Sequence, residues 1–430
     1  MKKKIAFQTF GCKLNFAETS AIARKFPETE YETVEFGESA DYYVIHSCTV
    51  TGHAEKKTRA AIRQAMRKNP EASVAVIGCY SQLRPEEIRK IKGVEIVLGN
   101  NDKYRLPEYI DTLGKEKTAG VTEIKKPETF EPDFSAGDRT RAFFKVQDGC
   151  DYFCTFCAIP YARGRSRSAS VAETLNVARQ IAHSDVREIV LTGVNIGDFG
   201  RHRNESFFDL LKGLETMEGI DRIRISSVEP ELLNHGIIEL VAGSRKYMPH
   251  FHIPLQSGTD RILELMKRKY KREVFEERVH TIKKLMPHAC IAADVITGFP
   301  GETDEDFNQT RDFIESLPVS YLHVFTYSTR PGTLASRMED QVPDRVKQER
   351  SRILHALSDT KKDAFYAEHI NSVQEVLWES DNENGFMTGF TGNYIRCKKQ
   401  WDAASVNTIE RVILVSTDTD GIYYTKPYST

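Results

Sequence analysis

Short apolar runs alternate with amphipathic stretches over the first 125 residues of the chain. The apolar or β-branched runs lie at 4–10, 42–48, 73–79 and 94–98. Between them, residues 53–68 and 85–92 place apolar side chains at helical spacing. Strands that alternate with helices in this way favour a parallel sheet with helices on both faces. We therefore expect an N-terminal, doubly wound α/β domain.

A second series of strands and helices begins near Ala142, after a polar stretch at 115–141 that we interpret as a linker. Its candidate strands are 143–148, 188–194, 222–228, 250–255, 290–297 and 321–327. Six strand–helix units in about 190 residues are typical of a parallel barrel or of part of one. The central region is therefore expected to form a partial (β/α)6 barrel, with functional groups at the carboxyl ends of its strands.

The last part of the chain has a different pattern. A charged helical stretch at 343–369 is followed, from residue 372, by short strand patterns with turn signals such as Asn384-Gly385 and Asp420-Gly421. This pattern predicts a small all-β domain. The expected domains are thus 1–125, 136–366 and 367–430.

Composition and charge narrow the class of protein. The chain has 430 residues, of which 40% are hydrophobic and 28% charged, and its formal net charge is −2. It therefore has no overall basic signature for nucleic acid. We find no apolar run of about 18 residues that could span a membrane. The apolar segment 5–10 is too short for a signal peptide, so we expect a cytoplasmic protein without membrane association.

Three of the eight cysteines form the strongest chemical signal. Cys150, Cys154 and Cys157 have the spacing Cys-x₃-Cys-x₂-Cys, and thiolates are the usual ligands of iron–sulfur clusters. A four-iron cluster normally takes four thiolates, so three of them leave one iron open to an outside ligand. Zinc is the alternative, but it usually has a fourth protein ligand and cysteines in closely spaced pairs.

Cys12, Cys48 and Cys79 each come at the carboxyl end of a predicted N-terminal strand. In open parallel sheets ligands bind outside that edge, so these three thiols can meet at one site. The alternative is that each is a small buried apolar residue. We interpret Cys290 and Cys397 in that structural way, because neither has a thiol neighbour in the sequence.

The Cys-x₃-Cys-x₂-Cys motif after the first barrel strand resembles the radical S-adenosylmethionine superfamily. The resemblance implies that the open iron binds S-adenosylmethionine, which is split to methionine and a 5′-deoxyadenosyl radical. It also implies that several residues at strand ends contact S-adenosylmethionine, although turn chemistry explains them equally well. These residues are Gly193, Glu229, Gln256, Ser257 and Gly298.

The segments 9–15, 46–51 and 78–82 resemble the N-terminal domain of the methylthiotransferase family. The resemblance covers nearly the whole chain, and it implies a TRAM-like C-terminal β domain. It also implies a second, auxiliary 4Fe–4S cluster on Cys12, Cys48 and Cys79, whose open iron carries the sulfur to be transferred.

Within this family, the segments 159–168, 191–197 and 224–230 resemble the MtaB branch. That branch methylthiolates C2 of N6-threonylcarbamoyladenosine next to the anticodon of tRNA, using two S-adenosylmethionine molecules. The implied partners are a tRNA anticodon stem-loop and an electron donor such as flavodoxin or ferredoxin, and we expect a monomer. The alternatives are the branches that act on isopentenyl-adenosine or on a ribosomal protein, and, more distantly, a non-catalytic RNA-binding metal protein.

Local basic residues give partial support for RNA binding. The helical stretch 55–68 carries six basic side chains against Glu55. Three arginines follow the cysteine loop directly, and a lysine lies in the β tail; as candidates for RNA or substrate contacts these are Arg163, Arg165, Arg167 and Lys398. The tail counts against a strong grip on RNA, because from Tyr366 onward it has nine acidic and five basic residues.

Overall fold

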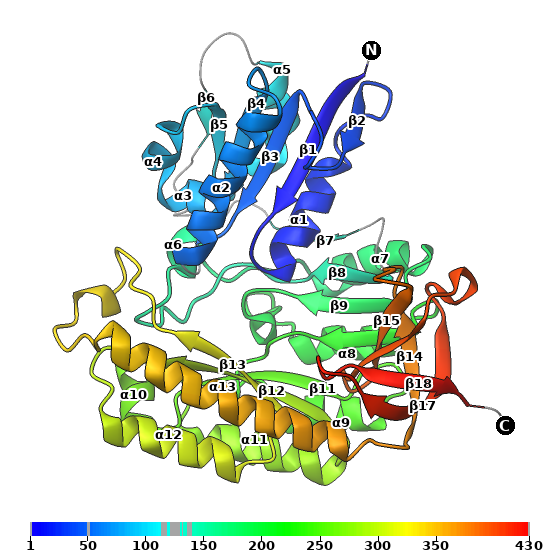
Figure 1. Cartoon of the computed structure of the whole chain (residues 1–430). Helices are drawn as coiled ribbons and strands as arrows, with labels where there is room; N and C mark the ends of the chain where they lie inside the picture. Colours follow the sequence, from blue (N-terminus) through cyan, green and yellow to red (C-terminus); the bar gives the residue numbers. More distant parts are fainter. Residues whose placement is uncertain are drawn as a thin grey trace.

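The computed structural model describes residues 2–49, 52–112, 118–120, 130, 132–135 and 140–428. Figure 1 shows an N-terminal α/β domain, a central set of strands covered by helices, and a small β domain at the end of the chain. The N-terminal domain lies along one side of the central strands, and the C-terminal domain lies at their amino ends (Figure 1). Within these ranges, no helix has the length and apolarity needed to cross a membrane.

The N-terminal sheet has the order β2-β1-β3-β4-β5-β6, and its neighbouring strands are parallel. The strands are β1 (Lys3–Thr9), β2 (Tyr31–Val34), β3 (Tyr42–Ser47), β4 (Ser73–Gly78), β5 (Val94–Leu98) and β6 (Thr118–Gly120). The helices are α1 (Lys13–Ala23), α2 (Gly52–Lys68), α3 (Cys79–Leu83), α4 (Pro85–Arg89) and α5 (Leu106–Asp111), with a 3₁₀ turn at Lys103–Arg105.

Successive residues of β3 enter different cores, because side chains alternate along a strand. Tyr43 packs in one core with Ile62 of α2, and Val44 packs in the other with Ile22 of α1. The expected doubly wound domain is therefore confirmed. The sequence pattern missed β2, which has only four residues and whose two central residues are exposed.

Six parallel strands form the central domain. They are β8 (Arg141–Lys145), β9 (Glu188–Thr192), β10 (Arg222–Ile225), β11 (His250–Gln256), β12 (Cys290–Thr297) and β13 (Tyr321–Thr326). The helices are α6 (Ile159–Arg163), α7 (Val171–Ala182), α8 (Phe207–Glu215), α9 (His235–Gly243), α10 (Asp260–Leu265), α11 (Arg272–Leu285), α12 (Asp304–Ser316) and α13 (Asp344–Ala367), with 3₁₀ turns at Ile196–Asp198 and Ala335–Arg337.

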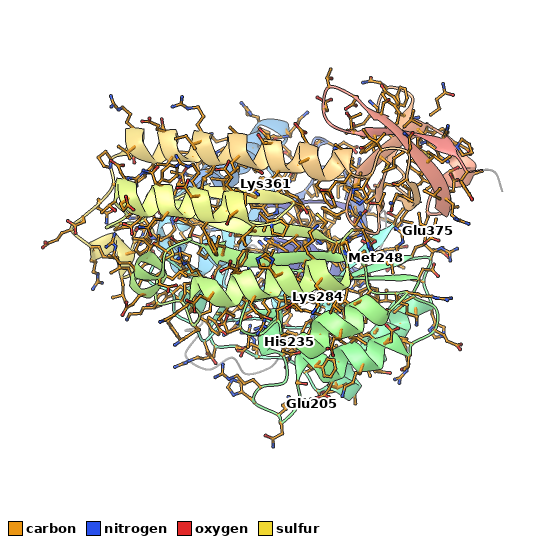
Figure 2. The ribbon with its side chains drawn as sticks, turned by 90° about the horizontal axis from the view of Figure 1, so that it is seen from below. Glu205, His235, Met248, Lys284, Lys361 and Glu375 are labelled. Carbon is orange, nitrogen blue, oxygen red and sulfur yellow. The ribbon has the colours of Figure 1, made fainter. Side chains whose placement is uncertain are left out.

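These strands form two sheets, β10-β9-β8-β7 and β11-β12-β13, where β7 (Asp133–Phe134) pairs antiparallel with β8. At the break, the amide of Val228 donates to the carbonyl of His252 at 3.0 Å. The expected partial barrel is confirmed, with an interruption between its third and fourth strands. Figure 2 shows α13 and α11, marked by Lys361 and Lys284, in the helical layer outside it. That layer packs on alternate strand residues such as Ile253 and Ala293.

The remaining strand positions face the opposite way, and we call this surface the inner face. Its wall on β8 and β9 is covered by the N-terminal domain, because Ala17 of α1 packs with Phe143 and Val190. Its wall on β11–β13 is more open, since the side chain of Phe325 is 44% exposed. Access to the inner face is therefore from the β11–β13 side.

The C-terminal strands close into a small barrel of order β14-β15-β16-β18-β17, which confirms the expected all-β domain. They are β14 (Val373–Trp378), β15 (Phe386–Thr391), β16 (Arg396–Gln400), β17 (Ile409–Thr417) and β18 (Tyr423–Pro427), with a 3₁₀ turn at Ala403–Ser405. Where this domain meets the central one, Met248 and Glu375 lie near each other (Figure 2) and line a cavity of about 500 Å³. Cys290 and Cys397 are buried in the apolar core that the two domains share.

The expected linker at 115–141 is wrong in part. Residues 118–120 form β6 and pair with β5, and residues 133–134 form β7 and pair with β8. The stretch therefore contributes an edge strand to each of two sheets. Residues 113–117, 121–129, 131 and 136–139 of this region lie outside the described residues.

Candidate functional site: two groups of three cysteines

Cys150, Cys154 and Cys157 lie in one loop that follows β8. The loop passes close to its own return segment, because a Cβ atom on Gly149 would lie 2.0 Å from the carbonyl oxygen of Arg165. Burial raises the pKa of both Cys150 and Cys157 to about 12, and the neighbouring thiols act in the same direction. Three thiols on one partly buried loop form a soft ligand set that is favourable for iron.

Arg268 places a positive charge against this loop. It donates to Sγ of Cys154 at 3.1 Å and pairs with the carboxylate of Glu229 through its other terminal nitrogen. Burial raises the pKa of Glu229 to about 7, while the charge of Arg268 acts in the opposite direction. The guanidinium thus favours the thiolate form of Cys154, which is the form that binds metal.

The expected S-adenosylmethionine contacts divide into two groups. Gly193 lies against Gln147, whose Oε1 accepts hydrogen bonds from the amides of Val194 and Asn195 at 2.9 and 2.8 Å. Gln256 has φ +64°, and its Oε1 is buried without a hydrogen-bond partner among the described residues. Glu229 lies near the cysteine loop through Arg268. These three residues remain at the site.

Ser257 and Gly298 form the second group, which packs against the outer helices. The hydroxyl of Ser257 is buried between the hydroxyls of Thr259 and Thr310. A Cβ atom on Gly298 would lie 2.3 Å from Cγ of Lys347, so this glycine allows the close approach of α13. Both residues thus have neighbours on the side of the outer helices, and their contact with S-adenosylmethionine stays a prediction.

Several buried polar atoms at the carboxyl ends of the central strands lack partners in the structure. Besides Gln256, these are Thr192 Oγ1, Thr297 Oγ1 and both amide atoms of Asn195. Buried polar groups normally have hydrogen-bond partners. The unpaired atoms lie at the edge where the cysteine loop begins, so the residues present fit a polar ligand bound beside a cluster.

Cys12, Cys48 and Cys79 meet at the carboxyl edge of the N-terminal sheet, after β1, β3 and β4. Gly11 has φ +103°, and a Cβ atom there would lie 2.9 Å from Sγ of Cys48. The amide nitrogen of Asn100 lies 3.5 Å from Sγ of Cys79. Cys48 and Cys79 are buried, whereas Cys12 is exposed. The arrangement holds two thiols in place and leaves one face of the group open.

The two cysteine groups are joined by packed helices. Helix α6 begins two residues after Cys157 and packs against α3, whose first residue is Cys79. Asn100, which contacts Cys79, also donates to the carbonyl of Ala162 at 2.7 Å. The separation of the two groups is therefore fixed by direct contacts between the domains.

A buried ion network crosses the same interface. The carboxylate of Glu18 accepts hydrogen bonds from Lys103 at 2.6 Å, Lys145 at 2.9 Å and Arg163 at 3.0 Å. Although burial acts in the opposite direction, these charges hold the pKa of Glu18 well below its usual range. Asp148 accepts from Arg163 at 2.9 Å and from Arg167 at 2.9 Å.

This network corrects the expectation that Arg163 contacts RNA. Its side chain is 1% exposed and is held by Glu18, Asp148 and Asn15. Arg167 is also largely buried, and it pairs with Asp148. Arg163 joins the two domains through Glu18 and Asn15, and Arg167 braces Asp148 within the central domain.

Arg165 and Lys398 have different surroundings. The side chain of Arg165 is 63% exposed and lies over the ring of Phe153 at 5.0 Å. Lys398 is ion-paired with Asp418 and covers Tyr424. Arg165 is ion-paired with Asp151 at 3.3 Å, but its side chain stays largely exposed, whereas that of Lys398 is 15% exposed. Arg165 is therefore the more accessible of the two for an RNA contact.

A cavity of about 200 Å³ lies between the domains beside both cysteine groups. Its wall includes Thr49, Arg84, Ala158, Tyr161 and Arg330. Thr49 follows Cys48 and Ala158 follows Cys157 in the chain. The cavity thus gives solvent access at the junction of the two groups.

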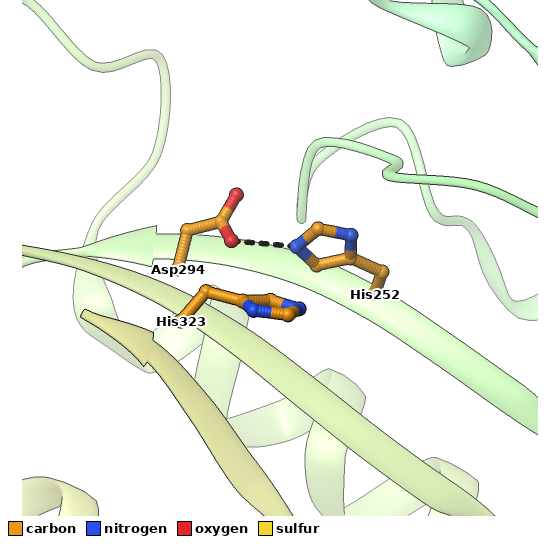
Figure 3. Close-up of side chains that lie close together, drawn as sticks. All are labelled: His252, Asp294 and His323. Atoms are coloured by element: carbon orange, nitrogen blue, oxygen red, sulfur yellow. Dashed lines mark hydrogen bonds and ion pairs between the residues drawn. The ribbon is translucent and has the colours of Figure 1, made fainter. Parts of the chain in front are cut away.

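The inner face carries a polar cluster that the sequence did not reveal. His252, Asp294 and His323 come from β11, β12 and β13, and Figure 3 shows them facing one another. Nε2 of His252 lies 2.6 Å from Oδ1 of Asp294, and the two imidazole rings lie 4.9 Å apart. The sequence alone does not show this cluster, because it does not give the register of neighbouring strands.

Comparisons with known protein families match the N-terminal and the central part of the chain separately. Residues 4–99 match the model of the uncharacterized protein family UPF0004, and residues 144–314 match the radical SAM superfamily. The chain is 44% identical over 405 residues to the threonylcarbamoyladenosine tRNA methylthiotransferase MtaB of Bacillus subtilis, covering 91% of this chain and 89% of that one. It is 41% identical to the MtaB of Aquifex aeolicus, covering 92% of this chain and 97% of that one.

A more distant relative and a solved structure agree with these matches. A tRNA-2-methylthio-N(6)-dimethylallyladenosine synthase of Alkaliphilus oremlandii is 33% identical, with 89% of this chain and 83% of that one covered. Among solved structures, the radical S-adenosylmethionine methyltransferase TsrM of Kitasatospora setae aligns with a TM-score of 0.56 at 14% identity. That alignment covers 78% of this chain and 77% of the other, and it shows a shared fold.

Proposed function

The chain belongs to the radical S-adenosylmethionine methylthiotransferases, in the MtaB branch, and we propose that it places a methylthio group on C2 of N6-threonylcarbamoyladenosine in tRNA. The observation that supports this most is the position of two three-cysteine groups on either side of one packed interface. A transfer that needs both a radical and a sulfur donor requires two such sites next to each other.

We assign one 4Fe–4S cluster to Cys150, Cys154 and Cys157, and the auxiliary 4Fe–4S cluster to Cys12, Cys48 and Cys79. When bound, these groups and S-adenosylmethionine supply the radical and the sulfur. Arg268 stabilises the thiolate of Cys154. Gln256 and Asn195 offer unpaired polar atoms to S-adenosylmethionine, and Gly193 keeps the strand end free of a side chain.

The RNA would approach across the exposed part of the cysteine loop. Arg165 and Tyr161 are exposed beside the cavity and the loop, and an unstacked anticodon-loop base can be drawn toward such an opening. The basic face of α2 starts close by, since Glu55 of that helix lines the same cavity. Arginine and lysine contacts to phosphates would set the position of the anticodon stem-loop.

We also propose domain boundaries, a cellular location, an oligomeric state and an electron donor. The domains are 1–125, 136–366 and 367–430, and the last is TRAM-like. The protein is a cytoplasmic monomer that receives electrons from a flavodoxin or a ferredoxin. No described helix could cross a membrane, which agrees with this placement.

The test is an anaerobic reaction of the reconstituted protein with S-adenosylmethionine, reductant and anticodon stem-loop RNA, read by nucleoside mass spectrometry. We expect a 2-methylthio product from threonylcarbamoylated RNA and none from isopentenylated RNA. Cys154→Ala should form neither product nor 5′-deoxyadenosine, and Cys48→Ala should form 5′-deoxyadenosine without product. Cys397→Ala, whose thiol is buried in an apolar core, is the matched control that should retain product. Product from the isopentenylated RNA alone would contradict the substrate assignment.

A further inference from the structure

Three side chains with metal-binding atoms meet on the inner face of the barrel, on strands that carry no cysteine of the two groups (Figure 3). Asp294 lies opposite His323 in the register of β12 and β13. Pro254 of β11 lies opposite Asp294, and His252 shares the face of Pro254 because side chains alternate along a strand. Three neighbouring parallel strands therefore fix the backbone positions of all three residues.

The distances between these side chains suit a single bound ion. Each side chain offers one ligand atom, and these atoms lie within 4.8 Å of one another. The closest pair is Nε2 of His252 and Oδ1 of Asp294, at 2.6 Å. A tetrahedral ion with ligand bonds of about 2.0–2.2 Å holds its ligand atoms about 3.3–3.6 Å apart. Because all three side chains are at least partly exposed, they have room for the small rotations that this geometry requires.

The state of His323 favours a role as a ligand. Neither of its ring nitrogens has a hydrogen-bond or ion-pair partner among the described residues, although its ring lies 4.9 Å from that of His252. Burial and, after it, the charge of His252 lower the pKa of His323, while Asp294 acts in the opposite direction. The imidazole is therefore neutral near pH 7, which is the form that binds metal. The ion pair of His252 with Asp294 is complete without a third member, so it does not explain the position of His323.

The chemistry of the three side chains selects the class of ion. Mg²⁺ and Ca²⁺ prefer oxygen ligands. Two imidazoles and one carboxylate suit divalent first-row transition metals such as Zn²⁺, Fe²⁺ or Co²⁺. Three protein ligands leave a position open, as in catalytic zinc sites. The strands β11–β13 form the more open wall of the inner face, so water or an oxygen atom of a ligand can reach that position.

We propose that His252, Asp294 and His323 bind one divalent transition-metal ion, at a site separate from the two cysteine groups. The inference does not depend on the proposed function. Metal-bound histidines usually donate their other ring N–H to a partner, and loss of such a partner weakens metal binding about tenfold to a hundredfold. No described residue accepts from a second ring nitrogen of His252 or His323. We therefore expect an exchangeable ion.

Equilibrium dialysis tests this with Zn²⁺ as the probe. Anaerobic, cluster-loaded protein without an affinity tag is dialysed against a series of buffered Zn²⁺ concentrations, and zinc and iron are measured per chain. We expect the wild type to bind one zinc with no loss of iron. Asp294→Asn keeps the shape of the side chain and an acceptor for His252, and it should weaken zinc binding at least about tenfold.

Two further variants make the comparison specific. His323→Leu removes a ligand that has no other partner, and it should weaken zinc binding to a similar extent. His235→Gln is the matched control, because it removes a surface histidine that pairs with Glu277 at 3.0 Å outside this cluster. It should bind zinc as the wild type does. Excess Mg²⁺ should not displace the zinc, because the ligand set is rich in nitrogen.

The cluster cysteines are the main competing site for zinc, and X-ray absorption at the zinc edge separates the two. Zinc at the proposed site has only nitrogen and oxygen neighbours, at about 2.0–2.2 Å, whereas zinc on thiolates has sulfur neighbours at about 2.3 Å. Sulfur neighbours in the wild type would overturn the proposal. Absence of zinc binding, an unchanged affinity in Asp294→Asn, or displacement of the zinc by Mg²⁺ would overturn it as well.

Discussion

The two groups of three cysteines are built in different ways. Cys150, Cys154 and Cys157 fall within eight residues of one loop, whereas Cys12, Cys48 and Cys79 are brought together from three strand ends that span 68 residues. The first group depends mainly on the path of a single loop. The second exists only when the N-terminal sheet is folded and in register. The assembled site should therefore be the more sensitive of the two to changes in tertiary packing.

The largest effect should come from the network that joins the two sites. Glu18→Gln removes the negative charge shared by Lys103, Lys145 and Arg163. Leaving buried cations without their partner costs about 3–5 kcal/mol. We expect a matching loss in the free energy of unfolding, and loss of about half of the iron because the auxiliary group is the one that dissolves. Denaturant titration and iron analysis check this, with the exposed Glu28→Gln as control.

The pH dependence of the network has a definite sign. The pKa of Glu18 is held well below its usual 4.5, and the pKa of Asp148 is also lowered. Their stabilisation is therefore complete above about pH 4.5 and is lost as the pH falls toward the folded-state values. Wild-type protein should lose stability in this acid range more steeply than Glu18→Gln. Equal slopes would show that this network does not control the interface.

A smaller effect is expected from substitutions that disturb one cysteine group at a time. Gly11→Ala forces a side chain into a left-handed conformation, against Sγ of Cys48 at 2.9 Å. Such strain costs about 1–3 kcal/mol. We expect the variant to lose the auxiliary iron but to keep reductive cleavage of S-adenosylmethionine, measured as 5′-deoxyadenosine. Gly149 has φ +70°, and a Cβ atom there would meet the backbone of Arg165. Gly149→Ala should therefore lose the cleavage of S-adenosylmethionine and keep the auxiliary iron. If each variant lost both the auxiliary iron and the cleavage of S-adenosylmethionine, the two sites would not assemble independently.

The sequence predicts features that depend on neighbouring residues better than features that depend on contacts distant in the chain. Strand ends and thiol spacing are local signals, so the six cysteines and both α/β regions could be located from the sequence. Arg163 was assigned wrongly because its partner Glu18 lies 145 residues away, and no local pattern distinguishes a buried arginine from an exposed one. The cluster of His252, Asp294 and His323 needs the register of three parallel strands. The packing of the outer helices against Ser257 and Gly298 could not be predicted either, for a related reason.

The smallest expected effect is on RNA binding at the surface. It distinguishes a contact on the cysteine loop from one on the C-terminal β domain. Arg165 is exposed and stacked on Phe153, so Arg165→Ala should weaken binding of the anticodon stem-loop severalfold and lower the slope of log K against log salt by about one. Lys398→Ala should change both quantities less, because the side chain of Lys398 is only 15% exposed and is paired with Asp418. Binding isotherms over a series of salt concentrations measure both. A larger effect at Lys398 than at Arg165 would move the RNA contact to the C-terminal domain, and would mean that its ion pair opens when RNA binds.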